Sequence, residues 1–377
     1  ALFDYWQVAV SVRFARIQYL FELKDKEGQS VLYGDKGFTD NSPENLALEG
    51  NRFKLPYIHE IDGCQVPDWV SKTVWYQIFP ERFANGNAEL SPEGALSWNA
   101  AISPKTTDFF GGDLHGIIDH LDYLQDLGIT GLYLCPIFES PSNHKYNTTD
   151  YFEIDRHFGD KETFRQLVEQ AHLRGMKVML DAVFNHMGDQ SAQWQDVLKH
   201  GEKSAYKDWF HIQKFPVTND KLMNPKELPY HTFAFASYMP KLNTANPEVK
   251  DYLLSVATYW IEHFDIDAWR LDVANEVDHQ FWRDFRKAVL AKKPDLYILG
   301  EVWNTSQPWL NGDEFHAVMN YPLSDSIKDY FLSRSKKTSQ FIAEINCQSM
   351  YYKQQISEVM FNLLDSHDTE RILTTSQ

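Results

Sequence analysis

The sequence has little cysteine, lacks long apolar runs and carries fewer basic than acidic residues, and each shortage excludes a class of protein. Its three cysteines, Cys64, Cys135 and Cys347, lie far apart and predict neither a disulfide framework nor a zinc site. No run of about 18 apolar residues is present, so no membrane span is expected. The 36 Lys and Arg against 53 Asp and Glu give a net charge of −17, which disfavours nucleic acid and anionic membranes as partners. We therefore expect a neutral substrate and the reducing cytoplasm.

Aromatic residues, by contrast, are abundant. They make up 15% of the chain, with 25 Phe, 19 Tyr and 11 Trp. Aromatic faces stack on flat ligands such as sugars, although core packing uses the same residues. At 377 residues and 43% hydrophobic composition, the chain is long enough for two or three domains, one of which can be a large α/β barrel.

The first 66 residues predict β-structure. Strand-like alternation covers residues 5–12, 17–25 and 30–38, and it is broken by turn residues such as Gly28 and Gly34. This pattern is typical of the later strands of a small sandwich. A boundary follows at Pro67, so we assign residues 1–67 to a first domain.

From residue 73 onward, apolar strands alternate with amphipathic helices. Helices are expected at 115–127, 162–174, 247–264, 278–293 and in a stretch near 324–352. Seven strands are expected, at residues 74–80, 130–136, 177–184, 266–273, 296–302, 317–321 and 359–364.

This alternation predicts an α/β fold, a (β/α)8 TIM barrel truncated after its seventh strand. A doubly wound sheet is disfavoured, because no Gly-rich phosphate turn follows the first strand. Residues 187–242 are polar and too long for an ordinary loop, so we expect an inserted subdomain after strand three. The barrel then comprises residues 68–186 and 243–377. Because an open barrel exposes unpaired edges, we expect the sequence to be a fragment at both ends.

Polar residues gather where the predicted strands end, which is the face on which TIM barrels place their chemistry. Arg270 and Asp272 lie two apart on the fourth strand, so both side chains share one face. A carboxylate inside a strand is costly unless a cation holds it ionised, and Arg270 is the expected partner. For this stretch alone, an ordinary buried ion pair is the alternative. The other residues at strand ends are Tyr146, Asp181, Asn185, His186, Glu301, His367 and Asp368.

Two neighbouring carboxyl groups with opposite duties are what glycoside cleavage needs. Asp272, beside Arg270, is expected to stay ionised and to act as the nucleophile. Glu301 has no neighbouring cation in the sequence and would feel the charges of Asp272 and Asp368, so we expect a raised pKa and the role of acid. Asp368 is a third acid that could grip ring hydroxyls and favour the distorted transition state.

These residues carry a family resemblance. Residues 181–186, 269–276, 300–303 and 366–368 read DAVFNH, WRLDVANE, GEVW and SHD, and they resemble the four motif regions of the α-amylase family of glycoside hydrolases. Residues 239–243, MPKLN, resemble the further motif of the neopullulanase, cyclomaltodextrinase and maltogenic amylase group. Residues 1–66 resemble the second half of the N-terminal starch-binding-type sandwich of that group.

The resemblance implies a retaining α-glucan hydrolase with Asp272 as nucleophile, Glu301 as general acid/base and Asp368 as transition-state stabiliser. Tyr146 is implied to stack under the sugar, and Arg270 to orient the nucleophile. His186 and His367 are implied to form hydrogen bonds with sugar hydroxyls, and His144 to make a weaker sugar contact. Asn275 and Glu276 match the positions that in relatives help to select water or a sugar as the acceptor.

Two departures from the family pattern stand out. Ser366 occupies a position where most of the family has Asn, and we expect a small effect. A set of residues also resembles the structural calcium site of the group, but Leu90 and Ser91 stand where relatives often carry acids, which predicts weak affinity. An ordinary Gly/Asn turn is the alternative. The resemblance implies no organic cofactor, and the implied metal residues are Asn85, Asn87, Gly111 and Asp113.

The implied substrates are cyclodextrins, pullulan and short maltodextrins, with cleavage of α-1,4 and α-1,6 links and transfer of sugars. The alternatives are an oligo-1,6-glucosidase, a cyclodextrin-forming transferase, and a non-catalytic relative kept as a carbohydrate-binding or docking scaffold. MPKLN argues against the first, the preceding sandwich against the second, and the three retained acids against the third. Relatives usually pair through the N-terminal domain, so a homodimer is expected of the full-length protein.

Overall fold

The computed structural model describes residues 6, 8–59, 63–98, 100, 103–218 and 224–375, and the chain divides into two compact units. The first unit covers Ala1–Cys64 and the second covers Gln65–Gln377. Within the described residues, no helix is long and apolar enough to cross a membrane.

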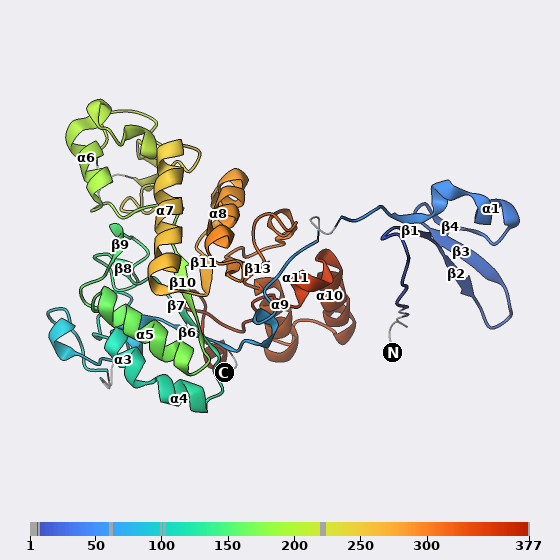
Figure 1. Cartoon of the computed structure of the whole chain (residues 1–377), viewed down its shortest axis with the longest axis horizontal. Coiled ribbons are helices and arrows are strands. Elements are labelled where there is room, and N and C mark those ends of the chain that lie inside the picture. Colours follow the sequence, from blue (N-terminus) through green and yellow to red (C-terminus); the bar gives the residue numbers. More distant parts are fainter. Residues whose placement is uncertain are drawn as a thin grey trace. The chain divides into compact units, whose positions relative to one another are not determined.

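The first unit is built from two small antiparallel sheets (Figure 1). One pairs β1 (Ile17–Tyr19) with β5 (Phe53–Leu55), and the other orders β2 (Phe21–Lys24), β3 (Ser30–Gly34) and β4 (Gly37–Asp40) as a meander. Gly28 and Gly37 have φ angles of 91° and 94°, which glycine adopts at no steric cost, and they allow the two tight turns. Helix α1 (Pro43–Ala47) follows, capped by Ser42. The predicted strand at 5–12 is not formed at residues 6 and 8–12, and its other residues lie outside the described part.

The second unit is organised around a curled parallel sheet of the TIM-barrel type. Its strand order is β13-β12-β11-β10-β7-β6, so consecutive strands along the barrel path are hydrogen-bonded neighbours. The bounds are β6 Trp75–Ile78, β7 Gly131–Leu134, β10 Lys177–Ala182, β11 Ala268–Leu271, β12 Tyr297–Gly300 and β13 Ala317–Val318.

These six strands lie inside the first six predicted ranges. The seventh predicted strand, 359–364, is a single parallel bridge between Met319 and Phe361. Its neighbour β13 has two residues, which leaves little edge for a longer ladder. Side chains such as Tyr133, Met179 and Tyr297 fill the barrel interior and are fully buried.

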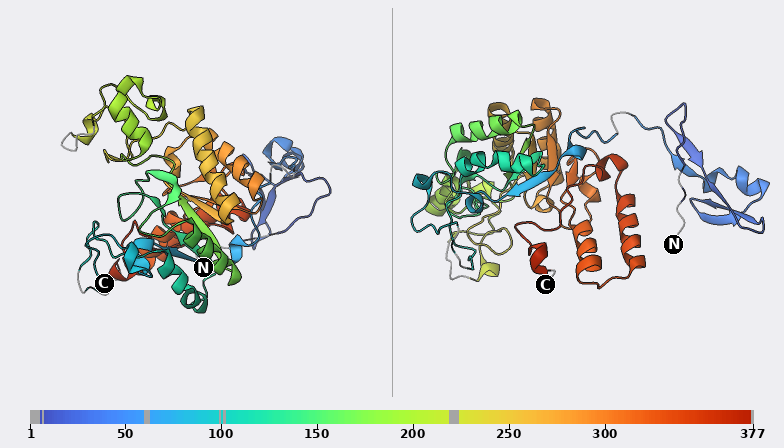
Figure 2. Two further views of the ribbon diagram at one scale, coloured as in Figure 1. Left: turned by 60° about the vertical axis from the view of Figure 1, so that its left-hand side comes forward. Right: turned by 90° about the horizontal axis from the view of Figure 1, so that it is seen from below.

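Helices lie along the outside of the sheet (Figures 1 and 2). The apolar stripes of the helices at 161–173, 247–264 and 279–292 are buried, as the helical spacing predicts, whereas those at 338–351 and 372–375 have no buried residue. The bounds are α2 Pro80–Phe83, α3 Leu114–Asp119, α4 Leu121–Asp126, α5 Lys161–Leu173, α7 Pro247–Phe264, α8 His279–Lys292, α9 Tyr321–Ile327, α10 Thr338–Tyr351, α11 Gln354–Ser357 and α12 Ile372–Thr375. Single-turn 3-10 helices are Glu49–Asn51, Val70–Lys72, Ala88–Leu90, Gly201–Lys203, Lys207–Trp209, Pro225–Glu227, Ala274–Glu276 and Gln307–Trp309.

Two predicted helices are broken. The helix expected at 115–127 is split into α3 and α4 at His120. The His120 ring lies 2.7 Å from the Gly116 carbonyl, so the backbone N–H of His120 donates to the Ile117 carbonyl and not to that of Gly116. The stretch near 324–352 is α9, a π-helical turn η10 (Lys328–Leu332) and α10. A further hairpin of β8 (Phe138–Glu139) and β9 (Asp150–Ile154) was not predicted from the sequence.

Residues 187–242 leave the barrel between β10 and α7. The segment contains α6 (Ala192–His200), whose Trp194 packs edge-on against Phe210 and Tyr230. Isolated bridges tie its ends together, including His186 to Lys241 at the point where the chain leaves and re-enters the barrel. This places the MPKLN stretch beside the end of β10.

Candidate active site

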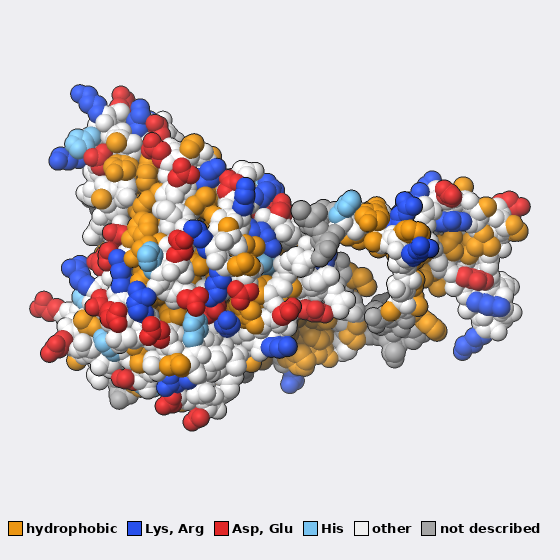
Figure 3. Space-filling view, viewed as in Figure 1, with side chains coloured by type: hydrophobic (Ala, Val, Ile, Leu, Met, Phe, Trp, Pro, Cys, Tyr) orange, Lys and Arg blue, Asp and Glu red, His pale blue; other side chains and the backbone are white. Residues whose placement is uncertain are grey.

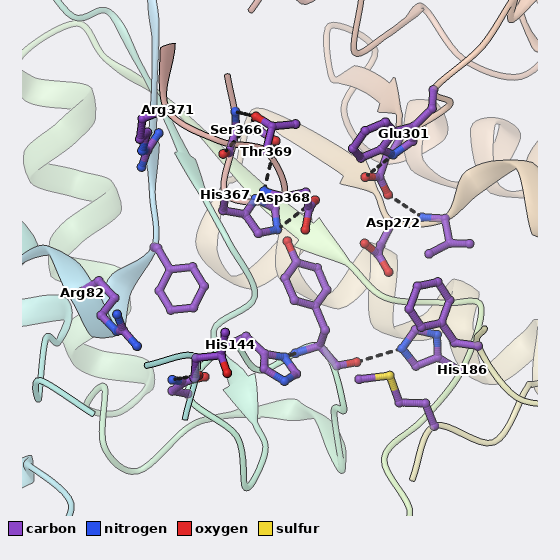
Figure 4. A pocket seen from close by; sticks show the side chains of 18 of the residues that line it. Arg82, His144, His186, Asp272, Glu301, Ser366, His367, Asp368, Thr369 and Arg371 are labelled. Atoms are coloured by element: carbon purple, nitrogen blue, oxygen red, sulfur yellow. Dashed lines mark hydrogen bonds and ion pairs between the residues drawn. The ribbon is translucent and has the colours of Figure 1, made fainter. Parts of the chain in front are cut away.

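A cavity of about 1000 Å³ opens at the carboxyl ends of the parallel strands (Figure 4). All three predicted catalytic acids line it, although they are 29 and 67 positions apart along the chain (301 minus 272, and 368 minus 301). Figure 4 shows Asp272, Glu301 and Asp368 around one common space. The predicted residues in the lining are His144, Tyr146, His186, Asp272, Asn275, Glu301, His367 and Asp368.

Arg270 lies beneath this cavity and contacts three carboxyl groups at once. Its side chain is fully buried, with one terminal nitrogen 2.6 Å from Asp272 Oδ1 and 2.9 Å from Asp181 Oδ1. Its other terminal nitrogen lies 2.8 Å from Glu301 Oε1. Register puts Arg270 beside Asp181 on β10, and Glu301 follows the neighbouring β12. An isolated ion pair, the simpler alternative from sequence, does not describe this arrangement.

Glu301 has one cation and two N–H donors around its carboxylate. Besides Arg270, the backbone N–H of Val273 donates at 2.9 Å and the indole N–H of Trp303 at 3.1 Å. Burial alone would raise the pKa of Glu301, yet the Arg270 charge and these N–H groups hold it below the ordinary value. The expectation of a raised pKa was wrong, because the sequence shows no cation next to Glu301 whereas the fold supplies Arg270.

Asp272 shows the opposite shift. Burial raises its pKa well above the ordinary value; the Arg270 charge opposes the rise, and the charges of Glu301 and Asp181 add to it. The sequence pointed to Arg270 as the partner of Asp272, and the fold shares this one guanidinium among Asp181, Asp272 and Glu301.

Asp368 is the most accessible of the three acids, with 40% of its side chain exposed. Burial, followed by the like charge of Glu301, raises its pKa to about 6. Its carboxylate lies 3.3 Å from His367 Nε2, and its backbone N–H donates to the Ser366 hydroxyl at 3.2 Å. The Ser366 hydroxyl thus supports its neighbour Asp368.

Tyr146 forms an aromatic wall with the predicted histidines. Its ring is parallel to that of His367, with centroids 5.3 Å apart and planes 4° apart, and its hydroxyl donates to Asp181 at 2.9 Å. His186 Nε2 lies 3.0 Å from the Tyr146 carbonyl, and His144 accepts the Tyr146 N–H. Burial lowers the pKa of His186 and His367 to about 3 and that of His144 to about 4, so all three rings are neutral near pH 7.

Glu276 is not among the described residues that line the cavity. Its carboxylate lies 3.4 Å from Lys241 of the MPKLN stretch, which also contacts Asn185 and the Glu276 carbonyl. Asn275, one residue earlier, does reach the cavity.

The predicted metal residues lie together. Both carboxylate oxygens of the fully buried Asp113 accept backbone N–H groups, from Gly86, Asn87 and Gly116, at 2.7–3.2 Å. Asp113 is thereby the N-cap of α3. The Asn85 side chain donates to Ser91, and Gly111 adopts a φ of 73° beside them. Asp113 is the one acid of the predicted set, and the N–H donors on its oxygens weaken it as a ligand for calcium. Calcium binding stays a prediction.

Sequence reasoning missed several residues of the site. Gln77 on β6 lies 2.7 Å from His367 Nδ1. Its polar side chain inside an otherwise apolar strand could have marked it as a residue of the site. Trp303 lies two positions after Glu301 and lines the cavity, but an aromatic residue at the end of a strand is equally typical of the hydrophobic core. Phe233 stacks on His186 from the inserted segment, 5.1 Å between centroids, and nothing in its surroundings marked it. Other unpredicted lining residues are Phe79, Arg82, Pro104, Thr106, Asn143, Met239, Val273, Thr369 and Arg371.

Comparison with known proteins places this geometry in context. Residues 77–377 match the family described as alpha amylase, catalytic domain, and residues 1–59 match the alpha amylase N-terminal ig-like domain. The chain is 56% identical over 371 residues to an intracellular maltogenic amylase of Bacillus subtilis (strain 168), covering 98% of this chain and 61% of the relative. It is 57% identical over 373 residues to a cyclomaltodextrinase of Geobacillus thermopakistaniensis, covering 99% and 62%.

A solved cyclomaltodextrinase structure superposes with a TM-score of 0.88 at 49% identity, covering 98% of this chain and 62% of that one. The chain therefore spans less than two thirds of the length of these relatives. Because the catalytic-domain match covers well over half of the chain, and because the acids meet at the strand ends as the motifs require, the chain belongs to the α-amylase family of glycoside hydrolases.

Proposed function

We propose that the whole protein is a retaining α-glucan hydrolase. It cleaves the α-1,4 and α-1,6 bonds of cyclodextrins, pullulan and maltooligosaccharides. It transfers the released glycosyl group either to water or to another sugar. The observation that carries the proposal is the single Arg270 guanidinium in contact with Asp272 and Glu301 at the floor of a cavity that Asp368 also lines. The names of the relatives, maltogenic amylase and cyclomaltodextrinase, support the substrate class.

In this reaction Asp272 attacks the anomeric carbon, and Glu301 protonates the leaving oxygen and then activates water. For this chemistry Asp272 must be ionised and Glu301 protonated when substrate is bound. Positive charge that develops on the sugar in the transition state favours the ionised form of Asp272. Asp368 binds the ring hydroxyls and stabilises the distorted sugar.

The aromatic and imidazole groups bind the sugar beside the scissile bond. Tyr146 offers its face, with its hydroxyl fixed on Asp181. To bind sugar hydroxyls, neutral His186 must exchange its contact with the Tyr146 carbonyl, and neutral His367 its contact with Gln77 or Asp368. His144 adds a further contact.

The acceptor side is set by Asn275 and Glu276. Asn275 reaches the cavity, so it contacts the incoming water or sugar directly. Glu276 acts from outside the lining through Lys241. The reaction contains no step through a calcium ion.

We also propose the domain plan inferred from the sequence: residues 1–67 as part of the N-terminal sandwich, 68–186 with 243–377 as the barrel, and 187–242 as an inserted domain. The homodimer through the N-terminal domain and a cytoplasmic location belong to the same proposal. The printed name of the Bacillus subtilis relative, intracellular maltogenic amylase, supports the location.

The test is a comparison of initial rates of the full-length protein on cyclodextrin, pullulan and starch. We expect cyclodextrin and pullulan to be cleaved faster than starch, with retention of the anomeric configuration in the first product. Starch preferred many-fold over cyclodextrin would contradict the substrate class. Cleavage confined to isomaltooligosaccharides would favour an oligo-1,6-glucosidase, and binding of maltooligosaccharide without turnover would favour a carbohydrate-binding scaffold.

A further inference from the structure

Trp303 and Tyr321 form a tight face-to-face stack beside the acids. Their ring centroids lie 4.0 Å apart and their planes differ by 6°. Trp303 follows β12 and is 45% exposed at the cavity, whereas Tyr321 begins α9 and is 2% exposed. The indole N–H of Trp303 donates to Glu301 Oε1 at 3.1 Å, so the buried ring fixes the plane of the group that contacts the carboxylate.

The hydroxyl of the same tyrosine contacts the loop that carries the third acid. It lies 3.1 Å from the hydroxyl of Ser366, a residue that is 1% exposed. The Ser366 hydroxyl accepts the backbone N–H of Asp368 at 3.2 Å, and the Ser366 N–H donates to the Thr369 hydroxyl at 2.8 Å. These bonds define the turn at residues 366–369 that presents Asp368 to the cavity.

We propose that Tyr321 is a positioning residue shared by two carboxyl groups of the site. Its ring holds the Trp303 indole that orients Glu301, and its hydroxyl holds the Ser366 hydroxyl that orients the Asp368 loop. The inference rests on the proposed hydrolase function and deepens it. Nothing in the one-dimensional motifs links residue 321 to either acid.

Tyr321 therefore has two contacts, the Trp303 arm through its ring and the Ser366 arm through its hydroxyl. They serve different parts of the reaction, so removing each one should change the kinetics differently. The Trp303 arm orients the group that protonates the leaving oxygen, and its loss matters most when the leaving group is poor. The Ser366 arm orients a group that binds the sugar ring, and its loss slows every substrate alike. Aryl α-maltosides that differ in the pKa of the phenol vary the first property while keeping the sugar constant.

The experiment measures kcat/KM of the full-length protein across such a series. Trp303→Phe keeps a stacked ring but removes the N–H, and we expect about five- to tenfold loss with the poorest leaving group and little loss with the best. This steepens the dependence on the phenol pKa. Tyr321→Phe keeps the stack and removes one oxygen, and we expect about fivefold loss across the whole series, as one hydrogen bond of about 1 kcal/mol gives.

Tyr330→Phe is the matched control. Tyr330 also stacks on an aromatic ring, Phe341, at 4.6 Å and 7°, and its hydroxyl lies 3.0 Å from that of Thr338, but it belongs to η10 and does not line the cavity. We expect unchanged kcat/KM, and Tm values within about 2 °C of the parent for all three variants.

Tyr321→Phe as active as the control, or Trp303→Phe with the same loss for every leaving group, would overturn the inference while the hydrolase function stands. A parent protein that releases no phenol from any member of the series would overturn the proposed function itself.

Discussion

At the scale of single residues, the main feature of the site is one guanidinium that contacts three carboxyl groups. Arg270 is the shared partner of Asp181, Asp272 and Glu301, and the three cavity histidines are neutral. The acids therefore differ in pKa through their hydrogen bonds and burial. Glu301 accepts two N–H groups beside its ion pair with Arg270 and has a lowered pKa, whereas Asp272 accepts one hydrogen bond, from Arg270, and has a raised pKa.

The raised pKa of Asp368 predicts a pH-dependent stability cost. Its pKa is about 6 in the fold against about 3.9 in an unfolded chain, so its stabilising contribution is full below about pH 4 and is lost as pH rises through 6. We expect Asp368→Asn, which cannot ionise, to have a Tm about 2 °C above the parent at pH 8, a shift kept small because the side chain is 40% exposed.

At pH 4 the two proteins should melt together. Thermal scans in buffers from pH 4 to 8 measure the difference. A constant Tm gap over that range, or a less stable variant at pH 8, would show that Asp368 is not held in a strained ionised state.

The chemical identity of the site could be predicted from the sequence at this scale, because strand-end positions and residue spacing are visible there. The pKa order could not. It depends on contacts between β10, β11 and the end of β12, which bring Asp181 and Glu301 to Arg270 across 89 and 31 positions (270 minus 181, and 301 minus 270).

At the scale of secondary structure elements, Asp267 joins four of them at the end of the barrel opposite the cavity. Just before β11, its carboxylate receives His172 of α5 at 2.7 Å, Lys177 of β10 at 2.9 Å and Lys293 after α8 at 3.0 Å. Burial alone would raise the pKa of Asp267, but these groups hold it far below the ordinary value. The cluster fixes the register of β10 against β11, and so the height of Arg270 beside Asp181.

We expect Asp267→Asn to lower the free energy of unfolding of the barrel unit by about 3 kcal/mol at pH 7, because two lysines lose their buried counter-charge. The folded pKa is depressed, so this contribution is present above about pH 4 and is lost as pH falls through the folded pKa.

Urea unfolding of the parent and the variant at pH 7 and pH 3 measures the loss of unfolding free energy and its decrease on acidification. Glu262→Gln, which removes a half-exposed partner of Lys292, is the matched control and should cost less than about 0.5 kcal/mol. An Asp267→Asn cost no larger than the control, or one that grows on acidification, would contradict the role of the cluster.

The elements themselves were predictable to different degrees. Helix α7 forms at its predicted bounds because Asn246 caps it, proline follows and its apolar stripe is long. The break at His120 and the β8–β9 hairpin were not predictable, since each depends on a local hydrogen bond or a pairing that periodicity does not encode.

At the scale of the whole molecule, the alternation of strands and helices was enough to predict the parallel barrel-type sheet. The cavity was not predictable in the same way, because part of its wall comes from the inserted segment through Phe233 and Met239. The net charge is −17, and acidic and basic side chains are mixed over the outer helices on the face seen in Figure 3.

The most direct test of the central claim is the mass of the peptide that carries Asp272 after full-length Glu301→Gln is incubated with α-maltosyl fluoride. Fluoride leaves without a general acid, whereas water cannot be activated without Glu301, so a glycosyl-enzyme should accumulate. We expect a maltosyl label on Asp272, together with at least 100-fold slower turnover of maltooligosaccharide. A label on Asp368 or Asp181, or no covalent adduct and an inverted product, would contradict the assignment of Asp272 as the nucleophile.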